Sequence, residues 1–230
     1  MGDKMDIPAT EETYYDPYTD AASNARHSYR LPVIKRYLSV LPDGARVLDM
    51  GCGNGSLTNA WAHRNWRVFG VDASESGIQN ASAAYPAISF FCAPIGPEMV
   101  ATYGSNTFDA IVCSEVIEHI FLPRVLIGCA FELLRPGGLF LVTTPYNGYL
   151  KNIALAVSGN MDRHWTVLWD GGHIKFWSWK TLRAVLEERG FVDFKFTGAG
   201  RAPFLWKSMV VVSRKPQKRP AQTVMRDGCA

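Results

Sequence analysis

Hydrophobic residues occur in short runs along the middle of the chain, and these runs alternate with segments whose apolar residues lie three or four positions apart. Short apolar runs are typical of strands buried on both faces, whereas the wider spacing is typical of amphipathic helices. The runs predict strands over 46–50, 66–72, 88–93, 108–114 and 139–145. The spaced segments predict helices over 26–40, 56–64, 75–84 and 116–120 with 123–135. This alternation predicts an α/β fold with a doubly wound, mostly parallel sheet covered on both faces.

The pattern changes after residue 145. A short amphipathic helix is predicted over 146–158, followed by a segment rich in Trp and His, a helix over 178–189 and a hairpin of two final strands. We interpret 146–177 as a small cap insertion. The predicted organisation is a flexible N-terminal arm or lid over 1–25, a single domain over 26–214 that carries the cap, and a disordered tail over 215–230.

Composition places the chain among globular proteins of one domain, with 230 residues, 47% hydrophobic and 20% charged. The net charge of +3 is too small to indicate a partner. Residues 151–213, however, contain nine Lys or Arg and only five acids. This excess would favour an anionic substrate. The alternative, which the sequence favours, is an ordinary solvated surface.

The five cysteines form no CxxC pair, and three of them lie inside apolar runs. This usage suits buried, reduced thiols in a reducing cytosol better than a disulfide framework. The N-terminus shows no apolar segment typical of a signal peptide, and no apolar run reaches the ~20 residues of a membrane span. We therefore expect a cytoplasmic protein without a transmembrane segment; nothing in the sequence indicates its oligomeric state.

A glycine-rich loop follows the first predicted strand, in the stretch Val47–Gly55. Its spacing is GxGxG, and Ser56 stands where a dinucleotide-binding loop would have its third glycine. Asp49 ends the strand just before the loop. Its carboxylate would repel a pyrophosphate but can accept hydrogen bonds from a cationic amino-acid cofactor. The loop therefore favours such a cofactor over a dinucleotide.

Three further strand ends supply groups that suit the rest of such a cofactor. Asp72 closes the second strand, where a carboxylate is placed to bind two ribose hydroxyls. Ala93 and Pro94 follow the third strand and offer small apolar surface for a base, and Ser114 and Glu115 follow the fourth. The predicted cofactor-binding residues are Asp49, Gly51, Cys52, Gly53, Asp72, Ala73, Ala93, Pro94, Ser114 and Glu115.

The motifs VLDMGCGNGSL, GVD, FDAIVCSEVIEH, LLRPGGLFLVTTP and LEERGF occur in this order between about residues 40 and 215. Together they resemble the class I S-adenosylmethionine-dependent methyltransferases. The resemblance implies a Rossmann-like sheet of seven strands whose last strand is antiparallel. It also implies S-adenosyl-L-methionine as the cofactor, with Asp49, Gly51 and Gly53 at the methionine part, Asp72 at the ribose and Ala93 at the adenine.

The segment Glu115-Val116-Ile117-Glu118-His119 contains a second motif, ExxEH. At the start of a helix Glu115, Glu118 and His119 would share one face. The motif resembles that of ubiquinone-biosynthesis O-methyltransferases and is similar to that of small-RNA 2′-O-methyltransferases, where a later His, here His173, completes the site. The resemblance implies that these four residues bind a Mg²⁺-like ion and that Glu118, His119 and His173 serve catalysis. The alternative is that Glu118 and His119 only cap and pack the helix.

Other residues leave two interpretations open. Four tryptophans could stack on an aromatic acceptor or pack the cap onto the sheet; they are Trp165, Trp169, Trp177 and Trp179. Arg26, His27 and Arg30 could close over the carboxylate of the cofactor, or lie on a solvated helix face, which we favour. The helix at 146–158 could touch a membrane, but cap packing is the preferred interpretation.

These observations predict an enzyme that transfers a methyl group to an oxygen, or less readily a nitrogen, of a small-molecule acceptor. Nucleic acid is not an expected partner, because no added RNA-binding segment is present and the basic excess is modest. Two alternatives are kept: an RNA terminal ribose 2′-O-methyltransferase, and a non-catalytic member of the fold that only binds the cofactor.

Overall fold

A computed structural model describes residues 29–165 and 172–217. The predicted arm over 1–25 lies outside the described residues, as does most of the predicted tail. Among the residues described, no helix combines the length and apolar character needed to cross a bilayer.

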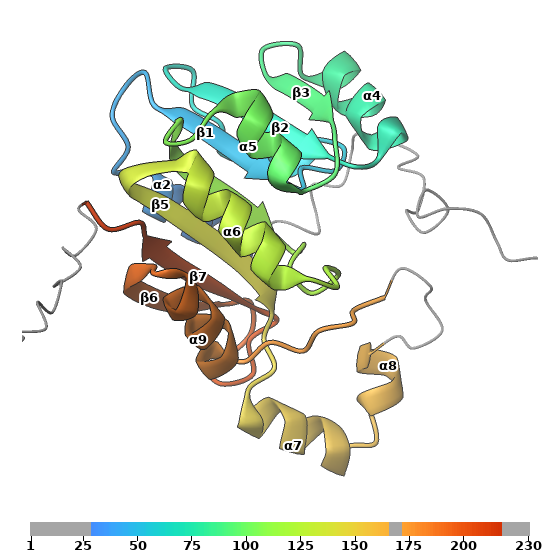
Figure 1. Ribbon diagram of the computed structural model, residues 1–230. Helices are drawn as coiled ribbons and strands as arrows, with labels where there is room; N and C mark the ends of the chain where they lie inside the picture. The colour runs from blue at the N-terminus through green and yellow to red at the C-terminus, as the bar shows by residue number, and fades with distance from the viewer. Residues whose placement is uncertain (1–28, 166–171, 218–230) are drawn as a thin grey trace, which may run out of the picture.

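Seven strands form one sheet in the order β3-β2-β1-β4-β5-β7-β6 (Figure 1). They are β1 (Arg46–Met50), β2 (Arg67–Asp72), β3 (Ser89–Cys92), β4 (Phe108–Ser114), β5 (Leu134–Pro145), β6 (Val192–Ala199) and β7 (Ser208–Arg214). The first five strands pair in parallel, whereas β7 is antiparallel to both β5 and β6. The predicted seven-stranded sheet with an antiparallel last strand is therefore confirmed.

Helices cover both faces of this sheet. They are α2 (Leu31–Leu38), α3 (Ser56–Trp61), α4 (Glu75–Ala84), α5 (Pro97–Tyr103), α6 (Pro123–Leu133), α7 (Tyr149–Val157), α8 (Met161–Trp165) and α9 (Trp179–Arg189). Figure 1 shows α5, α6 and α9 on the near face and α2 behind. Along β4, Ile111 and Cys113 face the core under α6, while Ala110 and Val112 face the core under α2. This period-two alternation explains why the strand is apolar throughout.

Two segments differ from the sequence predictions. The hydrophobic pattern predicts no helix where α5 lies. Residues 115–122 form turns, and α6 begins only at Pro123, so the expectation of one helical face for Glu115, Glu118 and His119 is wrong. Two features explain the difference: proline fits the first turn of a helix, and Glu115 adopts a φ of 56°, which turns the chain away from the helical path.

The predicted cap is partly described. The helix expected over 146–158 is present as α7, and a short α8 follows it. Both lie beyond the C-terminal end of β5, apart from the two helical layers (Figure 1). Residues 166–171 are outside the described part of the chain, and the chain then returns over 172–178 to α9.

Candidate functional site

The predicted site residues gather at the carboxyl ends of the parallel strands. The strand order reverses at β1, because β2 lies on one side of it and β4 on the other. In open parallel sheets such a reversal leaves a crevice in which ligands bind. The glycine loop between β1 and α3 lies at this point, next to the ends of β2 and β4.

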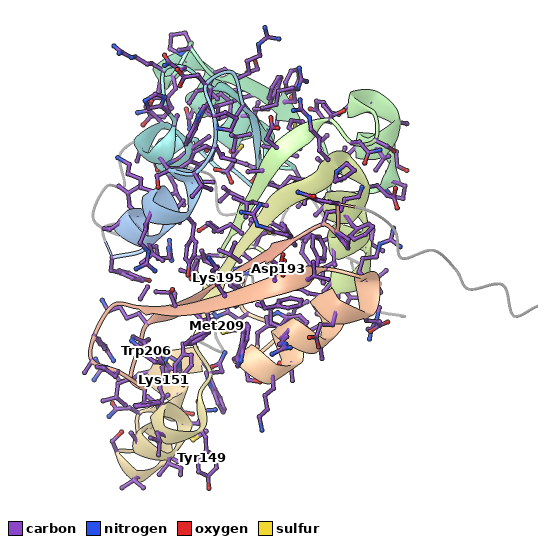
Figure 2. All side chains as sticks on the ribbon, turned by 90° about the vertical axis from the view of Figure 1, so that its left-hand side faces the viewer. Tyr149, Lys151, Asp193, Lys195, Trp206 and Met209 are labelled. Carbon is purple, nitrogen blue, oxygen red and sulfur yellow. The ribbon has the colours of Figure 1, made fainter. Side chains whose placement is uncertain are left out.

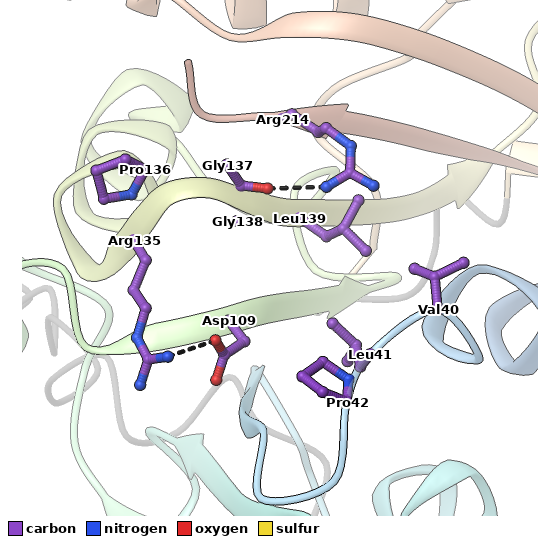
Figure 3. A pocket seen from close by; sticks show the side chains of 10 residues that line it. All are labelled: Val40, Leu41, Pro42, Asp109, Arg135, Pro136, Gly137, Gly138, Leu139 and Arg214. Carbon is purple, nitrogen blue, oxygen red and sulfur yellow. Dashed lines mark hydrogen bonds and ion pairs between the residues drawn. The ribbon is translucent and has the colours of Figure 1, made fainter. Parts of the chain in front are cut away.

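A cavity of about 250 Å³ lies elsewhere, near the start of β4 at the opposite end of the sheet (Figure 3). Its polar side chains already pair with partners on its own wall. Arg135 contacts Asp109 at 2.6 Å, and Arg214 donates a hydrogen bond to the carbonyl of Gly137 at 2.8 Å. The cavity is therefore not the predicted cofactor site.

Asp49 is a buried carboxylate at the tip of β1, 1% exposed. Its Oδ2 accepts a hydrogen bond from the hydroxyl of Thr58 at 2.6 Å. Its Oδ1 has no hydrogen bond of normal geometry to any described residue, although the indole of Trp61 lies nearby. Burial raises the pKa of Asp49 to about 7, against the opposing effect of the Thr58 hydroxyl. A half-satisfied buried carboxylate of this kind suits a cationic ligand group.

Asp72 is held in place at the tip of β2 by backbone groups. Its Oδ2 accepts from the N–H of Gly53 and its Oδ1 from the N–H of Ser74, both at 2.8 Å. Burial raises the pKa of this carboxyl despite the two donors. Each oxygen keeps a further lone pair, so the fixed carboxylate can still accept hydrogen bonds from a ligand's hydroxyls.

Gly51 brings the glycine loop against the turn that follows β4. Its φ is 85°, and a Cβ built there would lie 2.3 Å from a methyl carbon of Val116. A larger residue would therefore be strained by both its backbone and this contact. The close approach places the loop directly beside the segment 115–119.

The other predicted cofactor residues lie at neighbouring strand ends. The N–H of Ala93 donates to the carbonyl of Asp72 at 2.9 Å, and the thiol of Cys92 donates to the carbonyl of Ala73 at 3.6 Å. Cys52 is buried within the loop, and burial raises the pKa of its thiol. Two more predicted residues complete the set: Pro94 after β3 and Ser114 at the end of β4.

Glu115 points toward β5, β7 and α2. Its Oε2 lies 3.0 Å from Arg30 and accepts from the hydroxyl of Ser208 at 3.3 Å, while its Oε1 accepts from Thr143 at 2.9 Å. Arg30 is only 6% exposed, so the solvated-face interpretation is wrong for this residue. Arg26 and His27 lie outside the described residues.

Three of the four predicted metal ligands come together, namely Glu118, His119 and His173. One ligand atom from each lies within 4.8 Å of the others, and Glu115 is not part of this group. The two imidazole rings have centroids 4.9 Å apart. Burial lowers the pKa of His173 and so favours the neutral imidazole that can bind a metal ion.

Glu118 is completely buried within this group. Neither of its carboxylate oxygens has a hydrogen bond of normal geometry among the described residues. Burial, followed by repulsion from Glu115, raises its pKa well above the ordinary value; Thr144 and Arg30 oppose this only in part. A buried, unsatisfied carboxylate beside two imidazoles fits a divalent cation, and this mixture of ligands suits Zn²⁺ or Mn²⁺ better than Mg²⁺.

Backbone hydrogen bonds bring His173 to this place from the far end of the cap. The N–H groups of Ile174 and Lys175 both donate to the carbonyl of Glu118 at 3.0 Å. The indole N–H of Trp177 donates to the carbonyl of Ile117 at 3.3 Å. The returning segment is thus fastened onto the turn after β4, and the two histidines meet as a result.

The tryptophans of this region mainly pack. Trp177 is buried, and Trp179 packs against Phe196 on β6 with ring centroids 5.5 Å apart. The packing interpretation is therefore confirmed for these two residues. Trp165 contacts Phe176 within the cap, and Trp169 lies outside the described residues.

Sequence reasoning missed two polar residues of this region. Ser208, at the start of β7, reaches Glu115 because the final hairpin returns beside β5. Lys151 is buried on α7 and donates to the carbonyl of Tyr146 at 2.8 Å. No pattern in the sequence distinguishes it from an exposed lysine of an amphipathic helix.

Comparison with known proteins identifies the family of this chain. A family profile described as a methyltransferase domain matches residues 22–194. The ubiquinone biosynthesis O-methyltransferase of Caulobacter sp. (strain K31) is 38% identical over 119 residues, which cover 51% of this chain and 47% of that protein. The mitochondrial ubiquinone biosynthesis O-methyltransferase of Homo sapiens is 28% identical over 202 residues, covering 80% and 54%. The chain thus spans about half the length of these curated relatives.

A solved structure shows the same fold. The crystal structure of a SAM-dependent methyltransferase from Archaeoglobus fulgidus superposes with a TM-score of 0.60 at 16% identity, covering 83% of this chain and 97% of the other. At this level of identity the likeness concerns the fold alone.

Proposed function

The chain belongs to the class I S-adenosylmethionine-dependent methyltransferase family, and from this premise we propose that it transfers the methyl group to a hydroxyl oxygen of a small molecule. The observation that carries the proposal is the group of Glu118, His119 and His173 beside the glycine loop.

The cofactor fits the residues at the tips of β1 and β2. The Oδ1 of Asp49, which has no hydrogen bond of normal geometry among the described residues, would accept one from the ammonium of the methionine part. Asp72, fixed by two backbone donors, would accept hydrogen bonds from the two ribose hydroxyls. Ala93 and Pro94 would border the adenine. These roles leave the turn at 115–119 facing the methyl group side of the crevice.

The acceptor side suits a hydroxyl because a hydroxyl of high pKa must lose its proton to become a good nucleophile. A divalent ion held by Glu118, His119 and His173 would lower the pKa of such a hydroxyl as a Lewis acid. The protein's own part is to hold the acceptor in line with the methyl group and to keep water out. The names of the relatives, which are O-methyltransferases, also support oxygen as the acceptor atom.

The proposal can be tested on the full chain with S-adenosylmethionine and 4-methylcatechol as a probe. The measurement is the rate at which S-adenosylhomocysteine forms, before and after EDTA, with Zn²⁺, Mn²⁺ or Mg²⁺ added back. We expect EDTA to abolish transfer. We expect His173→Ala to reduce it about 100-fold, because ligand loss weakens the metal site, while S-adenosylhomocysteine still binds.

His63→Ala is the matched control, since His63 is exposed and lies before β2, away from the crevice. Metal content of the purified variants gives a second readout that does not depend on turnover. Transfer that resists both EDTA and His173→Ala would exclude the metal. Transfer to an aromatic amine of the same shape, but not to the catechol, would exclude oxygen as the acceptor atom.

A further inference from the structure

Buried ionisable side chains are held in different ways in different parts of the molecule. Lys151 lies on the cap, where Figure 2 shows it, and its ammonium donates to a backbone carbonyl, that of Tyr146, at 2.8 Å. Asp49 lies at the tip of β1 and receives a hydrogen bond from a side chain, the hydroxyl of Thr58, at 2.6 Å. A substitution can remove a side-chain donor but not a backbone carbonyl. The state of Asp49 therefore depends on the residue type at position 58.

Thr58 is a polar residue in a fully buried position. It lies within α3, and its backbone continues the helix, because its carbonyl accepts from the N–H of Ala62 at 2.9 Å. A threonine inside a helix can donate its hydroxyl to a carbonyl one turn back. Here the hydroxyl donates instead to Asp49 on the preceding strand. Threonine is a poor helix former and a buried hydroxyl is costly unless it is bonded, so packing alone would favour an apolar residue here.

The hydroxyl of Thr58 occupies one oxygen of the Asp49 carboxylate and leaves the other for a ligand. Thr58 donates to Oδ2, whereas Oδ1 has no hydrogen bond of normal geometry to any described residue. Trp61, one turn later on α3, lies near the same carboxylate, but its indole N–H makes no bond of normal geometry either. One oxygen is thus held by α3, and the other is placed to meet the cofactor.

The surroundings of Asp49 favour the protonated carboxyl, and Thr58 opposes them. Burial has the largest effect and raises the pKa of Asp49 to about 7; the Thr58 hydroxyl, next in size, lowers it, and the charge of Asp72 on β2 raises it. The thiols of Cys52 in the glycine loop and Cys113 on β4 also face Asp49. Burial raises the pKa of both thiols, so they stay uncharged near neutral pH. A protonated Asp49 would have no charge with which to attract an ammonium.

We propose that Thr58 is a positioning residue for the cofactor: its hydroxyl keeps the carboxylate of Asp49 ionised, with Oδ1 left to accept the cofactor's ammonium. The inference deepens the proposed function, because it rests on the role assigned there to Asp49 at the methionine part. Thr58 acts without touching the cofactor, since its hydroxyl is already engaged with Oδ2. A valine of nearly the same shape would keep the packing of α3 and lose the effect on Asp49.

The test compares two ligands that differ in the amino-acid part. S-adenosylhomocysteine carries the ammonium, whereas 5′-methylthioadenosine has the ribose and adenine alone, so that it would use Asp72 but not Asp49. Their dissociation constants are measured by calorimetry on the full chain from pH 6 to pH 9. The variants are Thr58→Val and Thr58→Ala, which remove the hydroxyl, and Thr58→Ser, which keeps it. Thr102→Val is the matched control, because Thr102 is exposed on α5 and donates to a helix carbonyl, that of Glu98.

In the wild type and in Thr102→Val, we expect the affinity for S-adenosylhomocysteine to rise with pH around a midpoint of about 7. Without the Thr58 hydroxyl the midpoint should rise by about one pH unit, as the loss of a charge-assisted hydrogen bond would give. The affinity at pH 7 should then be about fivefold lower, and at pH 9 it should lie within about twofold of the wild type. Proteins are compared at each pH, so titration of the ligand's own amine cancels.

Two further readings separate this role from a structural one. Thr58→Ser should restore most of the wild-type profile, because it returns the hydroxyl to the same place. The affinity for 5′-methylthioadenosine should change by less than about twofold in every variant, because that ligand has no ammonium.

The inference is wrong if Thr58→Val and Thr58→Ala keep the wild-type midpoint, or if the wild type shows no midpoint. It is also wrong if the affinity for both ligands falls equally at every pH, because Thr58 would then serve only the packing of α3. A wild-type protein that binds neither ligand would overturn the assigned cofactor site and the inference with it.

Asp49→Asn separates the role of Thr58 from the role assigned to Asp49. Unchanged affinity for S-adenosylhomocysteine in Asp49→Asn would remove Asp49 from the cofactor site, and the role of Thr58 with it. A clear loss in Asp49→Asn beside an unchanged Thr58→Val would overturn the role of Thr58 alone. The hydroxyl methylation is tested by turnover and by metal, which do not enter these titrations, so its failure would leave their result as it stands.

Discussion

Asp49 and Asp72 reach the crevice from adjacent strands, and groups close by in the sequence hold them, namely Thr58, Gly53 and Ser74. On the other side of the crevice Glu118 meets His173, 55 positions later, through the backbone of the returning cap segment. The cofactor side is therefore built by local hydrogen bonds within one βαβ unit. The acceptor side is built by the docking of a distant segment. Changes on the two sides should have separable effects.

Among substitutions that would separate the two sides, Asp72→Ala should have the largest effect, a loss of cofactor affinity. It removes two predicted hydrogen bonds to the ribose and leaves the N–H of Gly53 without its acceptor. Calorimetric titration should show the affinity for S-adenosylhomocysteine fall by about 100-fold or more. Asp43→Ala, a change of an exposed acid ahead of β1, is the control. A loss of less than threefold in Asp72→Ala would contradict the assigned cofactor site.

Gly51→Ala should have the next largest effect, because Gly51 joins the two sides. A positive φ of 85° and a Cβ only 2.3 Å from Val116 should together cost about 2–3 kcal/mol of unfolding free energy. Urea denaturation measures this value. Adding Val116→Ala should recover the part due to the contact but not the part due to the backbone. Equal stability of the single and double variants would show that the contact costs nothing.

A smaller effect, about tenfold, is expected from pH. Because the pKa of Asp49 in the free protein is about 7, its carboxyl is mostly protonated at pH 6 and mostly ionised at pH 8. Only the ionised form attracts the cofactor's ammonium, so the affinity for S-adenosylhomocysteine should fall about tenfold from pH 8 to pH 6. Asp49→Asn should bind more weakly and lose most of this dependence. A flat profile in the wild type would rule out the raised pKa.

The same shift predicts the effect of pH on folding. The pKa of Asp49 is raised above its ordinary value of 3.8, so its contribution to the unfolding free energy is greatest below that pH and declines until about pH 7. Asp49→Asn should therefore flatten the stability profile between these values.

The smallest effect is expected in the cap. Ile153→Ser alters a side chain on the exposed face of α7, so the unfolding free energy should change by less than ~0.5 kcal/mol. Leu186→Ala on α9, where the side chain is fully buried, should cost ~2 kcal/mol or more. If Ile153→Ser were as destabilising as Leu186→Ala, the cap would be part of the domain core rather than an attachment to it.

Much of the cofactor side could be predicted from the sequence. Strands such as β1 and β4 are apolar on both faces, which gives them short continuous apolar runs with clear ends. Because the ends of these strands are clear in the sequence, the positions of Asp49 and Asp72 at the tips of β1 and β2 can be predicted directly. The hydrophobic pattern and the hydrogen bonds between residues close in sequence agree there, so the sequence alone predicts where these residues lie.

The acceptor side could be predicted only in part. The left-handed conformation of Glu115 has no signature in the residue type. The apolar spacing therefore predicts a helix over 116–120, where the structure has a turn and α6 begins only at Pro123. The burial of Arg30 and Lys151 depends on tertiary packing that no spacing encodes. Only the resemblance to a known motif predicts that His119 and His173 meet. Their contact depends on backbone hydrogen bonds, which any sequence can make and which therefore leave no pattern in the residues.

The carbonyl of Glu118, which accepts two N–H groups from the returning segment, has a consequence for the diversification of such enzymes. Because main-chain atoms make this junction, the stretch between Tyr146 and His173 is free to vary in sequence without loosening it. An exchanged stretch would bring its own charges to the acceptor while the histidine stays in register. The backbone junction can therefore stay the same among related enzymes while the segment that selects the acceptor differs.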